Sequence, residues 1–592
     1  MTPTPIHYTI VPAHPAAHRF AVSCHVAAPN PDGQQFALPA WIPGSYLIRD
    51  FARHIVAIRA ECAGRPVRLE KLDKHTWQAA RVKRGAALTV FYEVYAWDLS
   101  VRGAHVDPTH AFFNGSSVFL RVVGHEHNAC RVDIQPPAGS AYADWRVASA
   151  LATAHGEEGC ARAHGFGLYR AEDYDELIDH PVEMGRFALG RFEAGGVVHE
   201  IAISGQHDCD MERLTADLAR ICAWHIAFFG APAPMARYLF LVTAVGQGYG
   251  GLEHRASTAL ICSRYDLPSR AMGKGKVSEA YRTFLGLCSH EYFHTWNVKR
   301  IKPAAFVPYD LGRENHTTLL WAFEGFTSYY DDLALLRSGL ITLADWLELS
   351  AKTISKVYCA PGRLRQTLAE ASFDAWSKFY RPDENTPNAL VNYYAKGALV
   401  ALALDLTLRL ETRGRVCLDD LMRALWEQHG KTGKGVGDDD IRTIAEAISG
   451  ADLRRFFADA VHGTRDLPLG KLLAALGITL DWEKTATPWL GVATGGDGKE
   501  LTLATVYDDG PAQRAGLAAG DVLVAFDGLR VTAATLATQL ARYPAGHTLA
   551  VHAFRRDELM PFDVILAPPA NDKARLRVKP GAHRLRRAWL GT

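Results

Sequence analysis

The sequence predicts a multidomain α+β protein, and three observations lead to this fold class. The chain has 592 residues, which is enough for about three to five domains. Residues 1–171 form short β-rich runs separated by Pro, Gly, Asn and Asp, a pattern typical of a β-sandwich. Residues 319–463 place apolar side chains at helical spacing, and residues 487–567 return to short strands with glycine turns.

The order of these patterns predicts five segments. After the N-terminal all-β domain at 1–171, residues 172–330 carry further strands, a helix near Met211–Phe229, a buried strand at 238–244 and a long helix at 278–300. We expect a mostly helical lobe at 331–485, a β module at 486–568 and a basic tail at 569–592, which we interpret as a solvated or docked extension.

Composition excludes several classes of partner. The 65 Lys and Arg nearly balance the 64 Asp and Glu, so the net charge of +1 creates no field directed at nucleic acid. No apolar run approaches the roughly 20 residues that span a bilayer, and the first residues lack the basic and apolar regions of a secretory signal. The ten cysteines are scattered singly. We expect a cytoplasmic protein without a membrane span, a zinc ribbon or a disulfide framework.

A metal site is indicated by the segment His290-Glu291-Tyr292-Phe293-His294. Two histidines four residues apart lie on one face of a helix, so both imidazoles can reach one cation. Zinc accepts imidazole nitrogen, and its catalytic sites combine three protein ligands with one water. Glu291 stands beside the first ligand and is placed to take a proton from that water. We therefore expect about one Zn²⁺ per chain, although such a motif also arises by chance on ordinary helices.

A third ligand is expected in the next helix, where Glu324 stands within the apolar and aromatic stretch WAFEGF. A carboxylate in such surroundings needs a cation or hydrogen-bond donors, and zinc would supply that partner. The alternative is a glutamate on a solvated helix face. Another histidine-rich segment, His125-Glu126-His127, lacks helical spacing and is interpreted as a loop.

These motifs resemble a known family. HEYFHTWNVKRIKP followed by WAFEGFTSYY is similar to the glycyl aminopeptidase family of gluzincin zinc metallopeptidases, and LPAWIPGSYLIRDFARHI at 38–55 resembles the N-terminal β domain of that family. The resemblance covers nearly the whole chain. It implies a thermolysin-like catalytic core with the ligands His290, His294 and Glu324, and a C-terminal PDZ domain. One turn after the third ligand stands Ser328, where thermolysin has a carboxylate, so the group that orients a zinc histidine stays open.

The segment QGYGGLEH follows the buried strand, and its glycines Gly250 and Gly251 let a ligand approach the backbone closely. An edge strand at this place could pair with an extended peptide. The segment is similar to the Gly-x-Met-Glu-Asn loop of the aminopeptidase N family, which implies that Glu253 binds the free α-amine of the substrate. Leu252 and His254 depart from that pattern. The alternative is a plain glycine-rich turn with a surface glutamate.

The segment NYYAKG at 392–397 is similar to the Tyr-Glu-Lys-Gly segment of the same relatives, in which the tyrosine stabilises the oxyanion. Tyr394 matches that tyrosine, and a phenol directed at developing negative charge assists the transition state. Tyr393 is the neighbouring competitor, and a plain core tyrosine is the alternative.

Residues 486–568 resemble a PDZ domain, most specifically in the segment GLAAGDVL at 516–523. The resemblance implies that Leu490, Gly491 and Val492 present backbone N–H groups to the terminal carboxylate of a C-terminal peptide, which would pair along the next strand. A purely structural role for this domain is an open alternative.

Three functions follow from these residues. The first is a zinc-dependent aminopeptidase acting on peptides with a free N-terminus, and the resemblance implies a preference for N-terminal Gly or Ala. The second is a zinc endopeptidase or oligopeptidase with PDZ-assisted substrate binding, in which Glu253 would have no free amine to hold. The third is a non-catalytic PDZ scaffold. The intact HExxH motif argues against the scaffold, because a scaffold has no need of Glu291.

Overall fold

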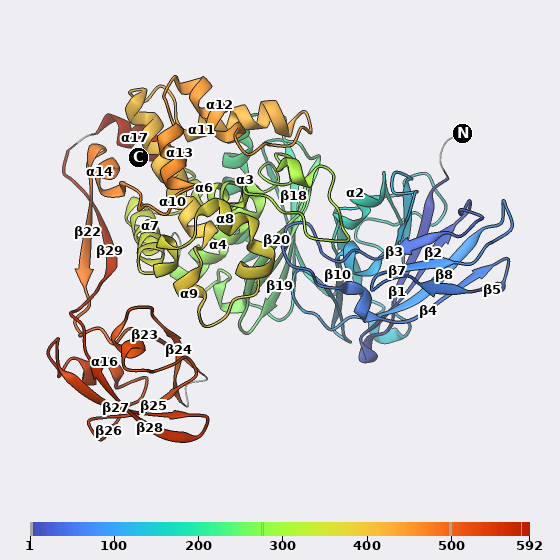
Figure 1. Ribbon diagram of the computed structural model, residues 1–592. Coiled ribbons are helices and arrows are strands. Elements are labelled where there is room, and N and C mark those ends of the chain that lie inside the picture. The colour runs from blue at the N-terminus through green and yellow to red at the C-terminus, as the bar shows by residue number, and fades with distance from the viewer. Residues whose placement is uncertain (1–3, 274, 276, 497–499, 582, 592) are drawn as a thin grey trace. The chain divides into compact units, whose positions relative to one another are not determined.

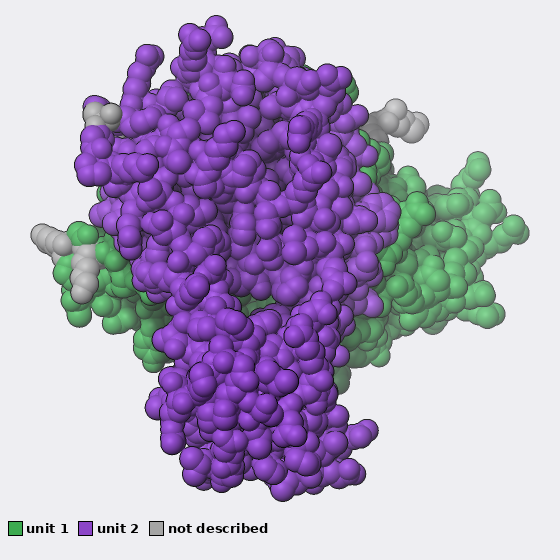
Figure 2. Space-filling model, turned by 60° about the vertical axis from the view of Figure 1, so that its left-hand side comes forward, with its two compact units in different colours: residues 1–315, 426–436 green, residues 316–425, 437–592 purple. Residues whose placement is uncertain are grey.

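The computed structural model describes residues 4–273, 275, 277–496, 500–581 and 583–591. The chain forms two compact units, which Figure 2 shows in separate colours. Each unit combines two stretches of sequence, Met1–Asn315 with Trp426–Val436 in the first and His316–Leu425 with Gly437–Thr592 in the second. Figure 1 labels the helices and strands of both.

The N-terminal part of the first unit is the expected β-sandwich. Burial alternates along strands such as β8 (Leu88–Tyr95), so that one face of the sheet packs on the core. The largest sheet has the order β14-β15-β12-β1-β2-β8-β4-β5, and two four-stranded sheets accompany it, β13-β16-β10-β9 and β11-β3-β7-β6. The other elements are β1 (Ile6–His14), β2 (Arg19–Val26), β3 (Gln35–Ala37), β4 (Ile55–Cys62), β5 (Arg65–Val67), β6 (Leu69–Lys71), β7 (Thr76–Ala79), β9 (Ala104–Val106), β10 (His110–Phe113), α1 (Gly115–Val118), β11 (Arg121–Val122), β12 (Cys130–Ile134), β13 (Arg146–Ser149), β14 (Ala152–Thr153), β15 (Gly167–Ala171), α2 (Tyr174–Ile178) and β16 (Val182–Gly185).

This β domain extends beyond the boundary predicted at residue 171. Strand β16 pairs with both β10 and β13, so it belongs to an N-terminal sheet. The next strand, β17 (Ala188–Ala194), pairs with β18 in a different sheet. The change of sheet therefore falls between residues 185 and 188. The sequence does not reveal it, because the strands on both sides are short and similar in composition.

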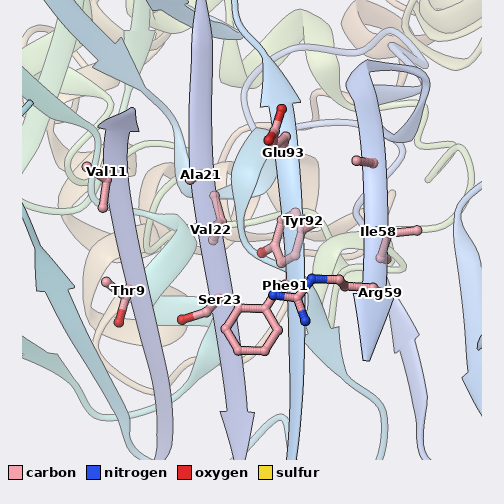
Figure 3. Close-up of a pocket in the computed structure, with 11 residues that line it drawn as sticks. Thr9, Val11, Ala21, Val22, Ser23, Ile58, Arg59, Phe91, Tyr92 and Glu93 are labelled. Carbon is pink, nitrogen blue, oxygen red and sulfur yellow. The ribbon is translucent and has the colours of Figure 1, made fainter. Parts of the chain in front are cut away.

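The largest sheet carries a shallow hollow of about 390 Å³ on one face (Figure 3). Side chains of β1, β2, β4 and β8 line it, and the Arg59 guanidinium lies 4.2 Å from the ring centroid of Phe91. None of the predicted site residues lines this hollow.

The rest of the first unit is built on a five-stranded sheet with the order β17-β18-β19-β21-β20. Strand β19 (Arg237–Val245) is the expected buried strand and lies parallel to both of its neighbours. Strand β20 (Tyr249–Glu253) stands at the edge of the sheet and pairs antiparallel with β21 (Ser257–Ser263). The remaining elements are β18 (Val197–Ser204), α3 (Met211–Phe229) and α4 (Glu279–Phe293).

Helix α4 is shorter than the helix predicted at 278–300. Ser278 caps its first turn by accepting the N–H of Tyr281, and the helix ends at Phe293. Val298 has a φ of 104°, which a β-branched residue rarely adopts and which no helix contains. The chain leaves the helix in tight turns instead, and the carbonyl of His294 accepts the N–H of Lys299 at 3.1 Å.

The second unit begins with the predicted helical lobe. Its long helix α10 (Tyr393–Glu411) is buried along most of its length and packs on α6 (Gly325–Arg337). An apolar helix buried on all sides is typical of the core of a large helical lobe. The other helices are α5 (Leu320–Phe323), α7 (Leu343–Tyr358), α8 (Leu368–Phe373), α9 (Thr386–Ala389), α11 (Leu418–Leu425), α12 (Asp440–Ser449), α13 (Arg454–Ala460) and α14 (Leu469–Ala475).

One stretch of the described chain, Thr386–Glu411, is long and apolar enough to cross a membrane by length and composition alone. However, 78% of its apolar window is buried inside the protein. The core helix of a folded lobe passes the same test, so this stretch is a weak indication of a membrane span.

The C-terminal β module and the basic tail also belong to the second unit. The module is a sheet with the order β23-β24-β25-β27-β28, and β26 (Leu529–Arg530) pairs with β25. The tail forms β29, which pairs with β22, and α17, whose Trp589 indole donates to the Tyr329 hydroxyl at 2.8 Å. The tail is therefore docked. The bounds are β22 (Ile478–Lys484), β23 (Val492–Gly495), β24 (Leu501–Val506), α15 (Pro511–Arg514), β25 (Val522–Phe526), α16 (Leu536–Leu540), β27 (Thr548–Arg555), β28 (Glu558–Ile565), β29 (Asn571–Val578) and α17 (Arg584–Leu590).

Candidate active site

Helix α4 carries the two predicted histidine ligands. His290 stands in its last turn, and His294 is its C-cap residue with helical dihedral angles, so the spacing of four residues keeps both on one face. The centroids of the two rings lie 4.7 Å apart. His294 is 2% exposed and Glu291 is 5% exposed. The predicted motif is therefore helical and largely buried.

The loop after α4 orients His294. The Nδ1 atom of His294 lies 2.7 Å from the carbonyl oxygen of Asn297. A neutral ring that donates from Nδ1 has its lone pair on Nε2, where a metal can bind it. A backbone carbonyl thus supplies the orienting group that the sequence left open at Ser328.

Glu253 ends the edge strand β20 and is 3% exposed. One carboxylate oxygen of Glu253, one of Glu291 and a ring nitrogen of His294 all lie within 4.8 Å of one another. The first unit therefore brings together the predicted amine anchor, the predicted base and one predicted metal ligand.

Glycines permit this close approach. A Cβ on Gly251 would lie 2.1 Å from Oε1 of Glu291, so only glycine lets strand β20 pass that carboxylate. Gly44, in the N-terminal β domain, has a φ of +98°, and its Cβ would lie 2.6 Å from Oε2 of Glu253. Gly250, by contrast, has no atom closer than 3.5 Å to its Cβ position. Of the two glycines predicted from the sequence, Gly251 is the one that the site requires.

His254 belongs to a buried ionic cluster. Its Nδ1 atom lies 3.4 Å from Oδ1 of Asp179, and the ammonium of Lys299 lies 2.6 Å from the same oxygen. Burial raises the pKa of Asp179, but Lys299, His254 and Arg255 outweigh this effect and hold that pKa well below its usual range. Because Lys299 comes from the loop after α4, the cluster ties this loop to the end of β20.

In the second unit, Glu324 stands at the junction of α5 and α6. It is 2% exposed, in agreement with the prediction of a buried carboxylate. Close to it, a Cβ on Gly325 would lie 2.5 Å from the carbonyl carbon of Gly397. The two glycines therefore let the start of α6 pack directly on the first turns of α10.

The two candidate tyrosines at the start of α10 differ in their surroundings. Tyr393 is fully buried, and burial, followed by the nearby Tyr380 and Glu324, raises its pKa well above the usual value. Tyr394 is half-buried, and its hydroxyl lies 2.8 Å from the hydroxyl of Tyr380. A substrate can contact only a side chain with exposed surface, which favours Tyr394.

Three groups that lie next to predicted site residues are absent from the sequence prediction. Tyr380 stands in a polar segment with no motif around it, and only the structure pairs it with Tyr394. The Asn297 carbonyl is a backbone atom that no residue pattern reports. Gly44 lies in the segment that carries the resemblance of the N-terminal domain, and this was the one signal that could have singled it out.

The predicted carboxylate loop of the PDZ domain is fixed by its own packing. Leu490 is buried in the core of the module, and its carbonyl accepts the N–H of Ala512 at 3.0 Å. Gly491 has a φ of +83°, and a Cβ there would lie 2.9 Å from Pro511. Val492 begins β23, the strand at one end of the sheet order. An edge strand that follows a glycine loop is the arrangement that strand addition by a peptide needs.

Three family models match successive parts of the chain. The M61 peptidase N-terminal domain matches residues 7–186, M61 glycyl aminopeptidase matches residues 283–400, and a PDZ domain matches residues 502–548. The first match ends where the sheet pairing ends the β domain. The second match includes His290, His294, Glu324 and Tyr394 in one family model.

Solved structures of two other proteins are similar to this chain. An aminopeptidase N family protein from Idiomarina loihiensis is 40% identical over 99% of this chain and 100% of that chain, with a TM-score of 0.94. An M1 zinc metallopeptidase from Deinococcus radiodurans is 12% identical over 79% of this chain and 95% of that chain, with a TM-score of 0.49. No match was found among curated proteins.

The HExxH helix beside an edge strand, together with these matches, defines a metallopeptidase. The chain belongs to the M61 glycyl aminopeptidase family. The family and the fold class predicted from the sequence are both confirmed.

Proposed function

We propose that the protein is a zinc-dependent aminopeptidase that removes small N-terminal residues, Gly or Ala, from peptides. The observation that carries the proposal is the buried carboxylate of Glu253, within 4.8 Å of the ligand atoms of Glu291 and His294. A carboxylate at the end of an edge strand would pair with the α-ammonium of a peptide laid along β20. The preference for small residues rests on the family description alone.

The donor set fits one zinc ion. His290 and His294 offer imidazole nitrogens on one helix face, and Glu324 offers a buried carboxylate within the same family match. Two imidazoles and one carboxylate form a common ligand set for catalytic zinc. When bound, the zinc would polarise the scissile carbonyl and lower the pKa of a water ligand.

The residues of the chain itself would move the protons. Glu291 would take a proton from the attacking water and deliver it to the leaving amine. The Tyr394 hydroxyl would donate to the oxyanion, and its hydrogen bond with Tyr380 would hold the phenol in position. Glu253 would hold the ammonium and so fix which peptide bond faces Glu291.

Hydrolysis of matched peptide amides, with free or acetylated N-termini, tests the proposal. A charge-assisted hydrogen bond contributes about 1.5–3 kcal/mol, so acetylation is expected to lower kcat/KM by about 10–150-fold. Glu253→Gln should cause a similar loss on free peptides and almost none on acetylated peptides. Glu193→Gln, an exposed residue on β17 at the other edge of the same sheet, is the control and should change neither.

The outcome also separates the alternatives. Equal cleavage of free and acetylated peptides at internal bonds would replace the aminopeptidase with an endopeptidase, because Glu253 would then hold no amine. If a chain fully loaded with zinc hydrolysed no peptide, the remaining function would be that of a non-catalytic peptide-binding scaffold.

A further inference from the structure

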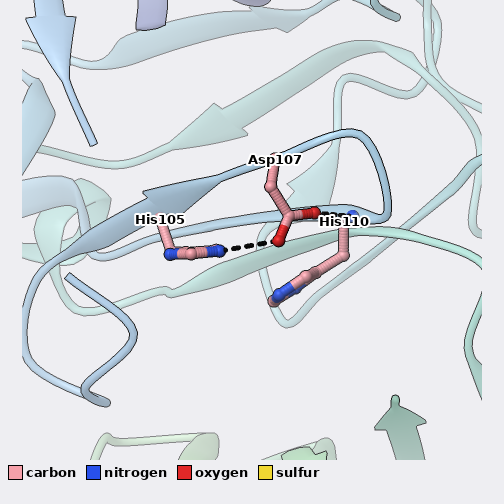
Figure 4. Close-up of side chains that lie close together, drawn as sticks. All are labelled: His105, Asp107 and His110. Atoms are coloured by element: carbon pink, nitrogen blue, oxygen red, sulfur yellow. Dashed lines mark hydrogen bonds and ion pairs between the residues drawn. The ribbon is translucent and has the colours of Figure 1, made fainter. Parts of the chain in front are cut away.

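The N-terminal β domain contains a second cluster of histidine and carboxylate side chains. His105 lies on β9, His110 begins β10, and Asp107 stands in the turn that joins the two strands (Figure 4). All three belong to the first unit, and the proposed mechanism uses none of them.

Three potential ligand atoms converge in this cluster. One atom from each of His105, Asp107 and His110 lies within 4.8 Å of the other two. The Nε2 atom of His105 is 3.1 Å from Oδ2 of Asp107. Two atoms at this separation, each about 2.1 Å from one ion, subtend an angle of roughly 95° at that ion, which metal sites readily accept. An ion can therefore take the place of the proton that the two atoms share.

Asp107 is fixed by its own turn. Its Oδ1 atom accepts the N–H of Thr109 at 2.6 Å, the hydroxyl of Thr109 at 2.5 Å and the N–H of His110 at 3.1 Å. The turn thus holds the carboxylate with Oδ2 directed at His105 (Figure 4).

His110 is oriented by a buried carboxylate. Its Nδ1 atom lies 3.1 Å from Oε1 of Glu183, which is 3% exposed and also accepts the hydroxyl of Ser204 at 2.6 Å. A histidine that donates one ring nitrogen to a carboxylate presents the other nitrogen as a ligand. This arrangement is typical of metal-binding histidines.

His105 is buried with few polar contacts. It is 4% exposed and stacks on Trp97, with the ring centroids 4.8 Å apart. Its Nδ1 atom has no hydrogen-bond partner within the described part of the chain. Its Nε2 atom, which faces Asp107, is the ring nitrogen that an ion in this cluster would contact.

We propose that His105, Asp107 and His110 bind a divalent transition-metal ion, represented by Zn²⁺, in a site separate from the HExxH centre. Two imidazoles and one carboxylate favour Zn²⁺ and its neighbours over Mg²⁺ and Ca²⁺, which prefer oxygen ligands. The side chains of Asp107 and His110 keep 22% and 13% exposure, so water can occupy the remaining positions. The bound ion would cross-link β9 to β10.

Zinc binding by the full chain carrying His294→Ala tests this site apart from the catalytic centre. That chain is expected to retain one zinc after desalting, measured by elemental analysis, and to lose it when His105→Gln and His110→Gln are added. The control adds His125→Gln and His127→Gln instead, which removes two histidines from a loop of the same domain. A His294→Ala chain without zinc, zinc retained after the His105 and His110 changes, or an equal loss in the control would overturn the proposal.

The proposed catalytic site can fail independently of this one. If the wild-type chain binds a single zinc, which is lost with His105 and His110 and kept with His294→Ala, the catalytic assignment fails and this site stands. In the opposite case, the wild-type chain binds a single zinc and His294→Ala alone removes it. The catalytic site then stands and the site proposed here fails.

A second measurement covers the possibility that His105→Gln unfolds the hairpin. Glu183→Gln keeps all three ligands and removes the group that orients His110, so zinc is expected to bind about 10–100-fold more weakly. Co²⁺ should quench the fluorescence of Trp97, which is 53% exposed and stacks on His105. This quenching should be missing in Trp97→Phe. Unchanged zinc affinity in Glu183→Gln, or equal quenching in both chains, would contradict the proposal.

Discussion

The predicted site residues of the two units differ in kind. The first unit carries His290, Glu291 and His294 on one helix and Glu253 at the end of one strand. In the second, Glu324 stands at the junction of α5 and α6, and the Tyr394 hydroxyl lies 2.8 Å from that of Tyr380, which follows a π-helical turn. Regular elements fix distances through their periodicity, so the spacing of the HExxH motif predicts that His290, Glu291 and His294 lie close together. Packing between elements fixes the positions of Glu324 and Tyr394, and the spacing of residues in the sequence does not predict these positions.

The largest effect is expected from Glu324→Ala, which tests whether the second unit supplies a metal ligand. Loss of one of three protein ligands should release the zinc, and activity should fall to background. Zinc content measured by elemental analysis should drop together with kcat/KM. The control is Glu348→Ala, an exposed glutamate on α7 of the same unit. A Glu324→Ala chain that keeps both its zinc and its activity would remove the second unit from the metal site.

Glu291→Gln is expected to have the next largest effect, and it separates chemistry from metal binding in the first unit. General-base assistance contributes about 10²–10⁴-fold, so kcat should fall by that factor while the zinc content stays unchanged. Glu279→Gln, at an exposed residue in the first turn of the same helix, is the matched control. Loss of zinc in Glu291→Gln would show that this carboxylate supports the metal rather than the proton transfer.

Tyr394→Phe tests the proposed oxyanion donor of the second unit, whose position the spacing of residues in the sequence does not predict. Removal of one oxyanion donor lowers kcat by about 10²–10³-fold, and KM should change little because the oxyanion exists only in the transition state. Tyr393→Phe alters a fully buried neighbour and serves as the control. Steady-state kinetics of both variants decides between them. A dead Tyr393→Phe beside an active Tyr394→Phe would reverse the assignment.

How much could be predicted from the sequence depends on whether a feature lies within one periodic element or arises from contacts between elements. The HExxH helix and the strand at 238–244 were predictable because each lies within one periodic element, whereas Glu253 was predicted from the resemblance of its segment to the aminopeptidase N loop. The end of α4 was predicted too late, since the turn at Val298 carries neither Gly nor Pro to mark it. Tyr380 and Gly44 act through contacts with distant residues, Tyr394 and Glu253. No local pattern encodes such contacts.

The smallest effect is expected from Asn388→Ala. This substitution tests what holds the segment between Tyr380 and Tyr394 in place. Asn388 lies on α9, between Tyr380 and Tyr394 in the chain, and is 3% exposed. Its amide donates to the Val506 carbonyl at 2.9 Å and accepts the Asp508 N–H at 3.1 Å, so the PDZ module is fastened to this segment.

Removing the Asn388 side chain leaves the Val506 carbonyl and the Asp508 N–H without this partner, which costs about 1–3 kcal/mol. Hydrogen exchange at residues 506–508 should become faster, and kcat should fall by less than about tenfold as Tyr394 loosens. Arg365→Ala removes only an exposed ion pair with Asp508, at 3.5 Å, and should change neither quantity. If Asn388 acts through Tyr394, then Asn388→Ala combined with Tyr394→Phe should lower kcat no further than Tyr394→Phe alone. Additive losses would mean that the PDZ module affects activity through another route.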